Sequence, residues 1–103
     1  MKRRIRLLPD AEGELAASEW YENRRDGLGV EFVAEVDVAL GGIAERPEAW
    51  PLWRSDRPYR RALRRFPFVV FYRLLGSGDV EVTAVAHSKR RPGYWLSRRL
   101  RLG

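Results

Sequence analysis

Phe-Val-Val-Phe-Tyr-Arg-Leu-Leu (residues 68–75) is followed by Gly-Ser-Gly-Asp (76–79) and by Val-Glu-Val-Thr-Ala-Val-Ala-His (80–87). β-Branched and aromatic residues favour strands, and the glycines between the two runs are typical of a hairpin turn. Residues 68–75 are apolar on both faces except at Arg73, which predicts a central strand. The alternation in residues 80–87 predicts one face with Val80, Val82, Ala84 and Ala86, and another with Glu81, Thr83, Val85 and His87.

A short strand and a helix are expected at the start of the chain. Residues 4–8 alternate apolar and polar side chains, which predicts an opening strand with Ile5 and Leu7 directed inward. Asp10 is a favourable helix N-cap, so we expect a helix from residue 11 to about residue 25.

A second helix is predicted over residues 28–46, because Asp26-Gly27 signals a turn and Pro47 ends the helical pattern. Its apolar residues recur at helical spacing at Phe32, Val36, Ala39, Leu40 and Ile43. The short link between the two helices predicts an antiparallel hairpin whose outer faces carry acidic residues.

Residues 47–58 contain three prolines and predict a loop that Trp50 and Trp53 pin to the core. A further strand is expected over residues 59–65, before Phe66-Pro67 interrupts the edge.

The predicted order is β-α-α-β-β-β in a single domain over residues 1–103. It predicts an α+β fold in which a helical hairpin packs on one face of an antiparallel sheet. Leu96 and Leu100 suggest a short C-terminal tail or helix.

Charge is unevenly distributed along the chain. Residues 10–53 hold eleven Asp and Glu against three Arg, whereas residues 54–103 hold thirteen Lys and Arg against three acids. The second half is therefore a candidate surface for a polyanion or an acidic partner.

Composition argues against several other functions. The chain has one His and no Cys, so neither a histidine nor a thiolate metal cluster is expected, and no cofactor is indicated. We also expect no membrane span and no signal peptide, and a cytoplasmic location.

Several short sequences in this order have a family resemblance. They are Trp20-Tyr21-Glu22; Gly27-Leu28-Gly29 followed by Phe32; Pro47; Arg64-Arg65-Phe66-Pro67-Phe68 leading to Tyr72; and His87 with Arg90, Pro92 and Trp95. Together they resemble the RelE/ParE superfamily of toxins from bacterial type II toxin–antitoxin modules. The similarity covers nearly the whole chain and is closest to the ParE-named plasmid-stabilisation branch, in which the last strand ends in a histidine followed by a basic residue.

The resemblance implies a small cytoplasmic toxin bound by a cognate antitoxin through an acidic segment. It also implies two mechanisms. RelE-type members are metal-independent endoribonucleases that cleave mRNA on the ribosome, whereas ParE-type members inhibit DNA gyrase without catalysis. A third reading is a basic nucleic-acid-binding module without toxicity.

RNA cleavage by a neighbouring 2′-hydroxyl needs proton transfer and neutralisation of charge on the phosphate. In the RelE pattern, Lys89 and Arg90 resemble the basic pair after the last strand, and Tyr94 resembles its tyrosine; His87 is a further candidate base. The chain departs from that pattern at Ala62 and Val69, where basic residues are expected. These gaps and the ParE-like ending at His87 favour gyrase inhibition, which is the alternative; mRNA cleavage is the first mechanism expected, and the two are nearly balanced.

The candidate residues for binding phosphate, RNA or a partner are Arg60, Arg61, Arg64, Arg65 and Arg73. Each candidate also has a structural reading. In the structural interpretation, the strand arginines are partners of the acidic helices, and Arg73 pairs with Glu81 across the hairpin. His87 is then a hydrogen-bonded structural residue, and Tyr94 with Trp95 anchors the tail on the sheet.

Overall fold

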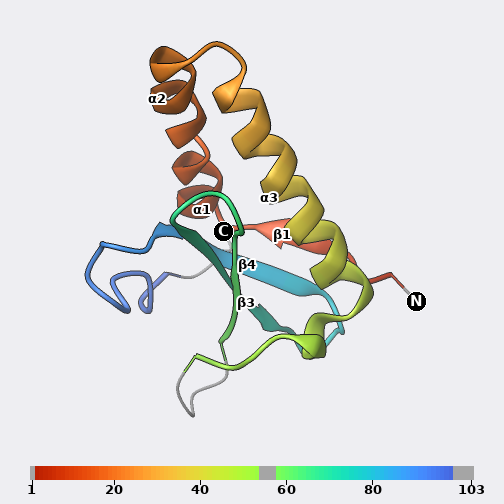
Figure 1. Cartoon of the computed structure of the whole chain (residues 1–103). Coiled ribbons are helices and arrows are strands. Elements are labelled where there is room, and N and C mark those ends of the chain that lie inside the picture. The colour runs from red at the N-terminus through yellow and green to blue at the C-terminus, as the bar shows by residue number, and fades with distance from the viewer. Residues whose placement is uncertain (1, 54–57, 99–103) are drawn as a thin grey trace.

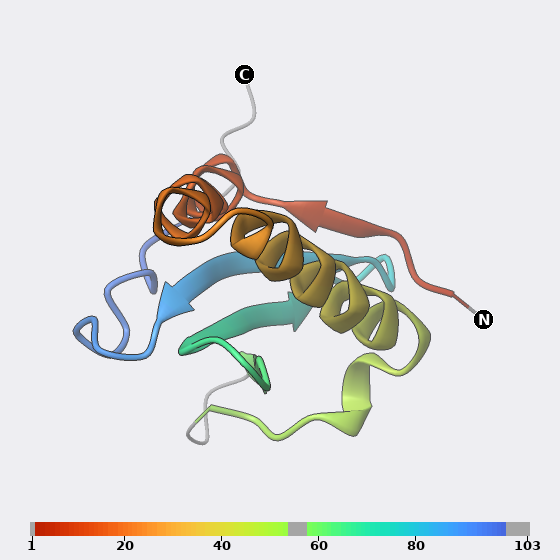
Figure 2. The same cartoon turned by 45° about the horizontal axis from the view of Figure 1, so that its top comes forward.

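The computed structural model describes residues 2–53 and 58–98, and it confirms an α+β fold (Figure 1). The helices are α1 (Pro9–Glu14), α2 (Ala17–Arg24) and α3 (Leu28–Glu45), followed by the 3-10 turn η1 (Pro47–Ala49). The strands are β1 (Ile5–Leu7), β2 (Tyr59–Ala62), β3 (Phe68–Leu74) and β4 (Val80–His87). The helices lie on one face of the sheet (Figure 2).

The sheet is mixed, so the expectation of a fully antiparallel sheet is wrong. Its order is β1-β4-β3-β2, and β1 runs parallel to β4 while the other neighbours are antiparallel. β1 is joined to the rest of the sheet through the helical layer and not through a hairpin. Such a crossover connection permits a parallel neighbour.

The first predicted helix is two helices. Leu8 is the N-cap of α1 and Pro9 is its first residue, so Asp10 is not the cap. Proline is favoured at that position because its missing N–H would have no partner in the helix. The chain then makes a tight turn, with the Leu15 N–H bonded to the carbonyl of Glu12, before α2 begins at Ala17. This break leaves Glu14 at the end of α1, where it faces β4.

The helical hairpin is closed by a carboxylate. The two oxygens of Glu22 accept the N–H groups of Gly27 and Gly29, at 2.8 and 2.9 Å. These backbone hydrogen bonds, that of Gly27 above all, hold the pKa of the Glu22 carboxyl below its usual range. Gly27 has φ of 86°, and a Cβ on Gly29 would lie 2.3 Å from the Ser18 carbonyl oxygen. Both glycines are therefore required by the turn and by the close approach of α2 to α3.

The main core lies between α3 and the sheet, as the helical spacing predicts. Phe32, Val36, Ala39 and Ile43 are fully buried, whereas Leu40 is partly buried against the same cluster. The Phe32 ring contacts the rings of Phe66 and Phe68 edge-on, at 5.2 and 5.0 Å between centroids. Such aromatic contacts add to the free energy of burial.

A β-bulge changes the predicted faces of β4. Phe71 pairs with Ala84 but Tyr72 pairs with Val82, so Thr83 is an extra residue on β4. Val80, Val82 and Val85 consequently face the main core, while Ala84 and Ala86 face the opposite side of the sheet. The prediction of uninterrupted alternation, with Val82 and Ala84 on one face, is therefore wrong.

The opposite face of the sheet is covered by the C-terminal segment, residues 88–98. Trp95 is buried and stacks on Phe71 at 4.2 Å between ring centroids, and Trp53 contacts both rings. Trp50 packs against the main core, which confirms the anchoring predicted for the two loop tryptophans. Residues 92–97 form turns, so within the described part of the chain no terminal helix is present; Leu100 lies outside that part.

β2 ends at Ala62, three residues earlier than predicted. The Leu63 N–H donates to the Phe68 carbonyl, so the chain turns here and does not extend the ladder to residue 65. No helix in the described ranges is long and apolar enough to cross a membrane.

Replacing Phe32 with alanine should lower the free energy of unfolding by about 3–5 kcal/mol, because it leaves a cavity beside the rings of Tyr21, Phe66 and Phe68. Denaturant unfolding measures this loss. The matched control is Val38→Ala on the exposed side of α3, which should change stability by less than about 0.5 kcal/mol. Equal losses in the two variants would contradict the burial of Phe32.

Candidate functional site

A basic cleft lies on the sheet face opposite the helices. Its volume is about 320 Å³, and it is bounded by β2, β3, the end of β4 and the C-terminal segment. It is lined by Trp53, Arg60, Val69, Phe71, Ala86, His87, Ser88, Arg90, Arg91, Pro92, Tyr94 and Trp95. Its inner surface is thus apolar and aromatic, and its charged residues are arginines.

Three guanidinium groups line this cleft. Arg60 comes from β2, where it pairs with Phe71, and Arg90 and Arg91 come from the turn after β4. No acidic residue of the described chain lines the cleft, so the positive potential of the three arginines favours an anion. Planar guanidinium groups bind carboxylate and phosphate with paired hydrogen bonds.

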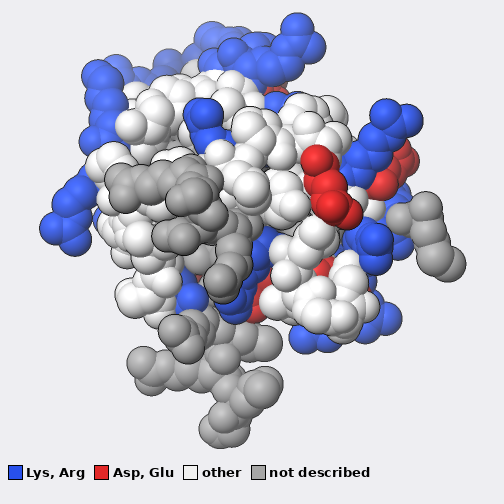
Figure 3. Space-filling model, turned by 90° about the horizontal axis from the view of Figure 1, so that it is seen from below, with Lys and Arg blue, Asp and Glu red and all other residues white. Residues whose placement is uncertain are grey.

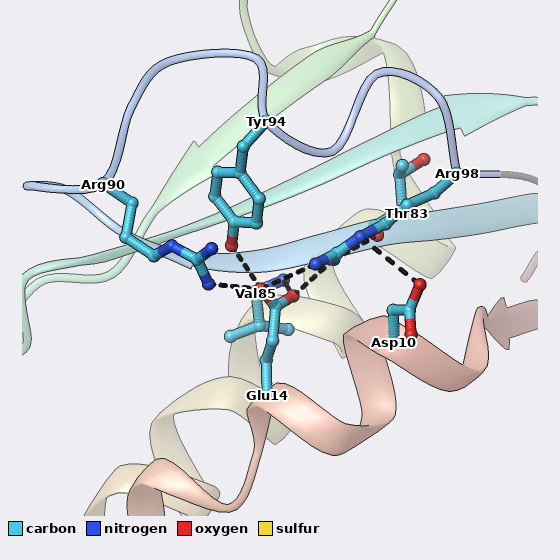
Figure 4. Close-up of polar contacts among 7 residues, drawn as sticks. All are labelled: Asp10, Glu14, Thr83, Val85, Arg90, Tyr94 and Arg98. Carbon is cyan, nitrogen blue, oxygen red and sulfur yellow. Dashed lines mark hydrogen bonds and ion pairs between the residues drawn. The ribbon is translucent and has the colours of Figure 1, made fainter.

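Glu14 organises the wall of the cleft (Figure 4). One oxygen accepts the Val85 N–H on the edge of β4 at 2.9 Å and an Arg98 N–H at 2.8 Å. The other oxygen accepts the hydroxyl proton of Tyr94 and lies 3.3 Å from the second Arg98 nitrogen. One carboxylate on α1 therefore holds both β4 and the C-terminal segment.

The two arginines beside Glu14 differ in how far their side chains are exposed to solvent. The Arg98 side chain is 15% exposed, and it also donates to the Thr83 carbonyl at 3.2 Å and lies 3.7 Å from Asp10. The Arg90 side chain is 56% exposed, lies 3.9 Å from Glu14 and stacks over the Tyr94 ring at 3.7 Å. Arg98 is therefore a structural residue, whereas Arg90 can turn toward a ligand in the cleft.

The Tyr94 hydroxyl is poorly suited to proton transfer. Burial, and after it the hydrogen bond to Glu14, raises the pKa of the Tyr94 phenol to about 12. The hydroxyl remains protonated at neutral pH and is bound to a carboxylate. The structure thus supports the reading in which Tyr94 and Trp95 anchor the tail on the sheet.

His87 and Lys89 occupy different places in the turn after β4. The Nδ1 atom of His87 accepts the Lys89 N–H at 3.1 Å, so neutral His87 carries its proton on Nε2. The ring also contacts Phe68 edge-on. Lys89 is exposed and does not line the cleft. His87 thus reaches the cleft as a hydrogen-bond donor when it is neutral.

Four of the five arginines predicted to bind phosphate or a partner, all except Arg60, lie outside the cleft. The Arg61 guanidinium lies over the Trp50 ring at 4.6 Å, and Arg65 forms an ion pair with Glu31 on α3. Backbone N–H groups of Arg64 and Arg65 donate to Glu35. Arg64 and Arg65 thus contact acidic residues of α3, and Arg61 packs on the loop after η1, so these three residues do not form one surface with Arg60.

Arg73 lies on the same sheet face as Arg60 but outside the basic cleft. It borders a separate hollow of about 800 Å³ between β3 and the C-terminal segment. Its Nε donates to Glu81 at 2.8 Å, which confirms the cross-hairpin pair expected from the sequence.

The structure brings together Arg60, His87, Arg90 and Tyr94, and it adds residues that were not among the predicted site residues. Arg91 was visible as part of the basic run after β4. No sequence pattern predicted the contact between Glu14 and Arg98, because the two residues are 84 positions apart in the sequence. From below, Lys and Arg side chains lie around much of the outline of the molecule, with Asp and Glu side chains among them on one side (Figure 3). Among the described residues, no three His, Cys, Asp or Glu side chains gather as metal ligands.

No protein-family model matches the chain, and no curated protein matches it. The function must therefore be inferred from the sequence and from the geometry of the basic cleft.

Replacing Glu14 with alanine should lower the free energy of unfolding by about 2–3 kcal/mol, because it leaves Arg98 and the Val85 N–H without their acceptor. Amide exchange at Val85, measured by NMR, should accelerate more than exchange at Val70. Glu45→Ala, at an exposed position on α3, is the control and should stay within about 0.5 kcal/mol of the parent. An unchanged Val85 exchange rate would rule out this role for Glu14.

Tyr94 should titrate near pH 12, two units above a free tyrosine at 10.0. Because its pKa is raised in the folded state, the stability contributed by the protonated phenol is complete below about pH 10 and is lost as the pH rises through about 12. The difference in ultraviolet absorbance between the parent and Tyr94→Phe isolates this titration. A Tyr94 midpoint near pH 10 would show that the phenol is not held by Glu14.

Proposed function

We propose that this protein is a toxin of the RelE/ParE type that inhibits growth by binding its target through the basic cleft, without catalysis. The proposed target is DNA gyrase, as in the ParE-type members that the sequence resembles. The observation that carries the proposal is the cleft itself: Arg60, Arg90 and Arg91 line it, while the candidate groups for proton transfer are engaged or protonated.

The geometry gives little support to a cleavage mechanism. The Tyr94 hydroxyl is bound to Glu14, and the Nδ1 atom of His87 is occupied by a backbone N–H. Ala62 and Val69 pair with each other on β2 and β3, where the RelE pattern has basic residues. A general base needs a free lone pair within reach of the proton that it removes. A binding function makes no such demand.

mRNA cleavage is the second candidate, and one observation favours it. His87 and Arg90 line the same cleft as Arg60, so a phosphate bound by the arginines would lie beside an imidazole that can donate a hydrogen bond. That arrangement supplies charge neutralisation and a hydrogen-bond donor, and the missing elements are a general base and a general acid.

The proposed cognate antitoxin binds through an acidic segment. Arg73 and Arg90 lie on the sheet face opposite the helices, whereas Arg61 lies on the helical side. An acidic segment bound to the open face can therefore contact Arg73 and Arg90 but not Arg61. The complementary surface is instead the basic cleft, where three arginines face one volume. Association driven by such charges is fast and depends strongly on salt.

Induced expression followed by pulse labelling tests the mechanism. We expect DNA synthesis to stop before protein synthesis. If protein synthesis stops first, the cleavage mechanism replaces gyrase inhibition, and if neither stops, the chain is a basic binding module without toxicity.

Single substitutions separate binding from catalysis. Arg60→Glu and Arg91→Glu should abolish growth arrest, because each places a negative charge in the cleft, whereas Tyr94→Phe should retain it. The control is Arg64→Glu, an exposed charge reversal outside the cleft. Circular dichroism verifies that each variant is folded. Loss of arrest in a folded Tyr94→Phe variant would contradict the non-catalytic mechanism.

A further inference from the structure

The outer side of the helical hairpin carries a groove of about 520 Å³. We call it the outer groove; it lies between α2 and α3, and its lining includes Ser18, Glu19, Val30, Val33, Ala34 and Asp37. The apolar residues of α3 that face the sheet belong to a different stripe, so the outer groove is a second apolar surface on the same helix. Val30 and Val33 are 70% and 37% exposed.

The charges around the outer groove are all negative. Glu19 and Asp37 are exposed, and within residues 2–53 and 58–98 neither carboxylate has an ion-pair partner. No Lys or Arg of the described chain lines the groove, although the whole protein has a net charge of +6. Exposed apolar residues between unpaired like charges mark a surface that a partner of opposite charge can cover.

The shape of the outer groove suits a helix. The side chains that line it from α2 and α3 include Ser18 and Ala34, and small residues allow another helix to approach closely. An amphipathic helix places apolar side chains in such a groove and polar ones along its rims.

We infer that the outer groove is a docking site for a partner helix with apolar residues on one side and Lys or Arg along both edges. A second copy of this chain is a poor occupant. Symmetric pairing of two grooves would bring Glu19 and Asp37 of one copy against those of the other, and like charges at an interface oppose association. The inference does not rest on the proposed function, because the groove and the basic cleft lie on opposite sides of the sheet.

Fluorescence anisotropy with two labelled synthetic peptides tests the inference. One peptide has Leu and Lys in a helical pattern, and the other has Leu and Glu in the same pattern. We expect the Leu/Lys peptide to bind the parent more tightly. Val30→Ser with Val33→Ser should weaken that binding by about tenfold, and Glu19→Lys with Asp37→Lys should do the same.

Two control variants make the result specific. Val38→Ser removes an exposed valine of α3 outside the groove, and Glu45→Lys with Glu48→Lys makes the same change of net charge elsewhere. Helical circular dichroism verifies folding of every variant. Equal losses in groove and control variants, or tighter binding of the Leu/Glu peptide, would overturn the inference. A dimer in sedimentation that the groove substitutions dissociate would assign the groove to a second copy and overturn it as well.

Discussion

The Glu14 carboxylate joins parts of the chain that no strand pairing joins. β1 covers β4 only as far as Val82, so the next part of that edge lacks a neighbouring strand. Glu14 accepts the Val85 N–H, and Arg98 donates to the Thr83 carbonyl, so the two side chains take the place of a strand there. Because buried backbone groups need partners, this pair protects the edge. The same carboxylate holds Tyr94, so the wall of the basic cleft depends on the end of α1.

The division of charge along the chain has two separate outcomes in the fold. Some of the charged residues pair within the protein: Glu31 pairs with Arg65, and Glu35 accepts backbone N–H groups from the same loop. Other charged residues lie on two surfaces of opposite sign. The basic cleft faces one side of the sheet, and the acidic outer groove lies on the helices that cover the other side. The two surfaces therefore have no lining residue in common.

Local patterns in the sequence predicted the main elements well. Helical spacing identified the buried stripe from Phe32 to Ile43, and the glycine turn identified the β3–β4 hairpin. The parallel β1, the bulge at Thr83 and the contacts of Glu14 were missed, because each depends on residues that are distant in sequence. In the candidate site, Arg60, His87 and Arg90 were among the predicted residues, but the sequence did not show which of the candidates would lie together. The hydrogen bond from Tyr94 to Glu14 could not be predicted from the local sequence around either residue.

The parallel pairing of β1 with β4 has a consequence for synthesis of the protein. Residues 5–7 pair with residues 80–82, and Glu14 binds Arg98. The segments that are synthesised first can therefore complete their contacts only after the last segments have been synthesised. Helices form from local contacts, whereas pairing between distant segments comes later. A chain still being translated can thus form α3 but not its sheet, which leaves an apolar stripe open to chaperones or proteases. The basic cleft is completed last, because residues 90–95 form one of its walls.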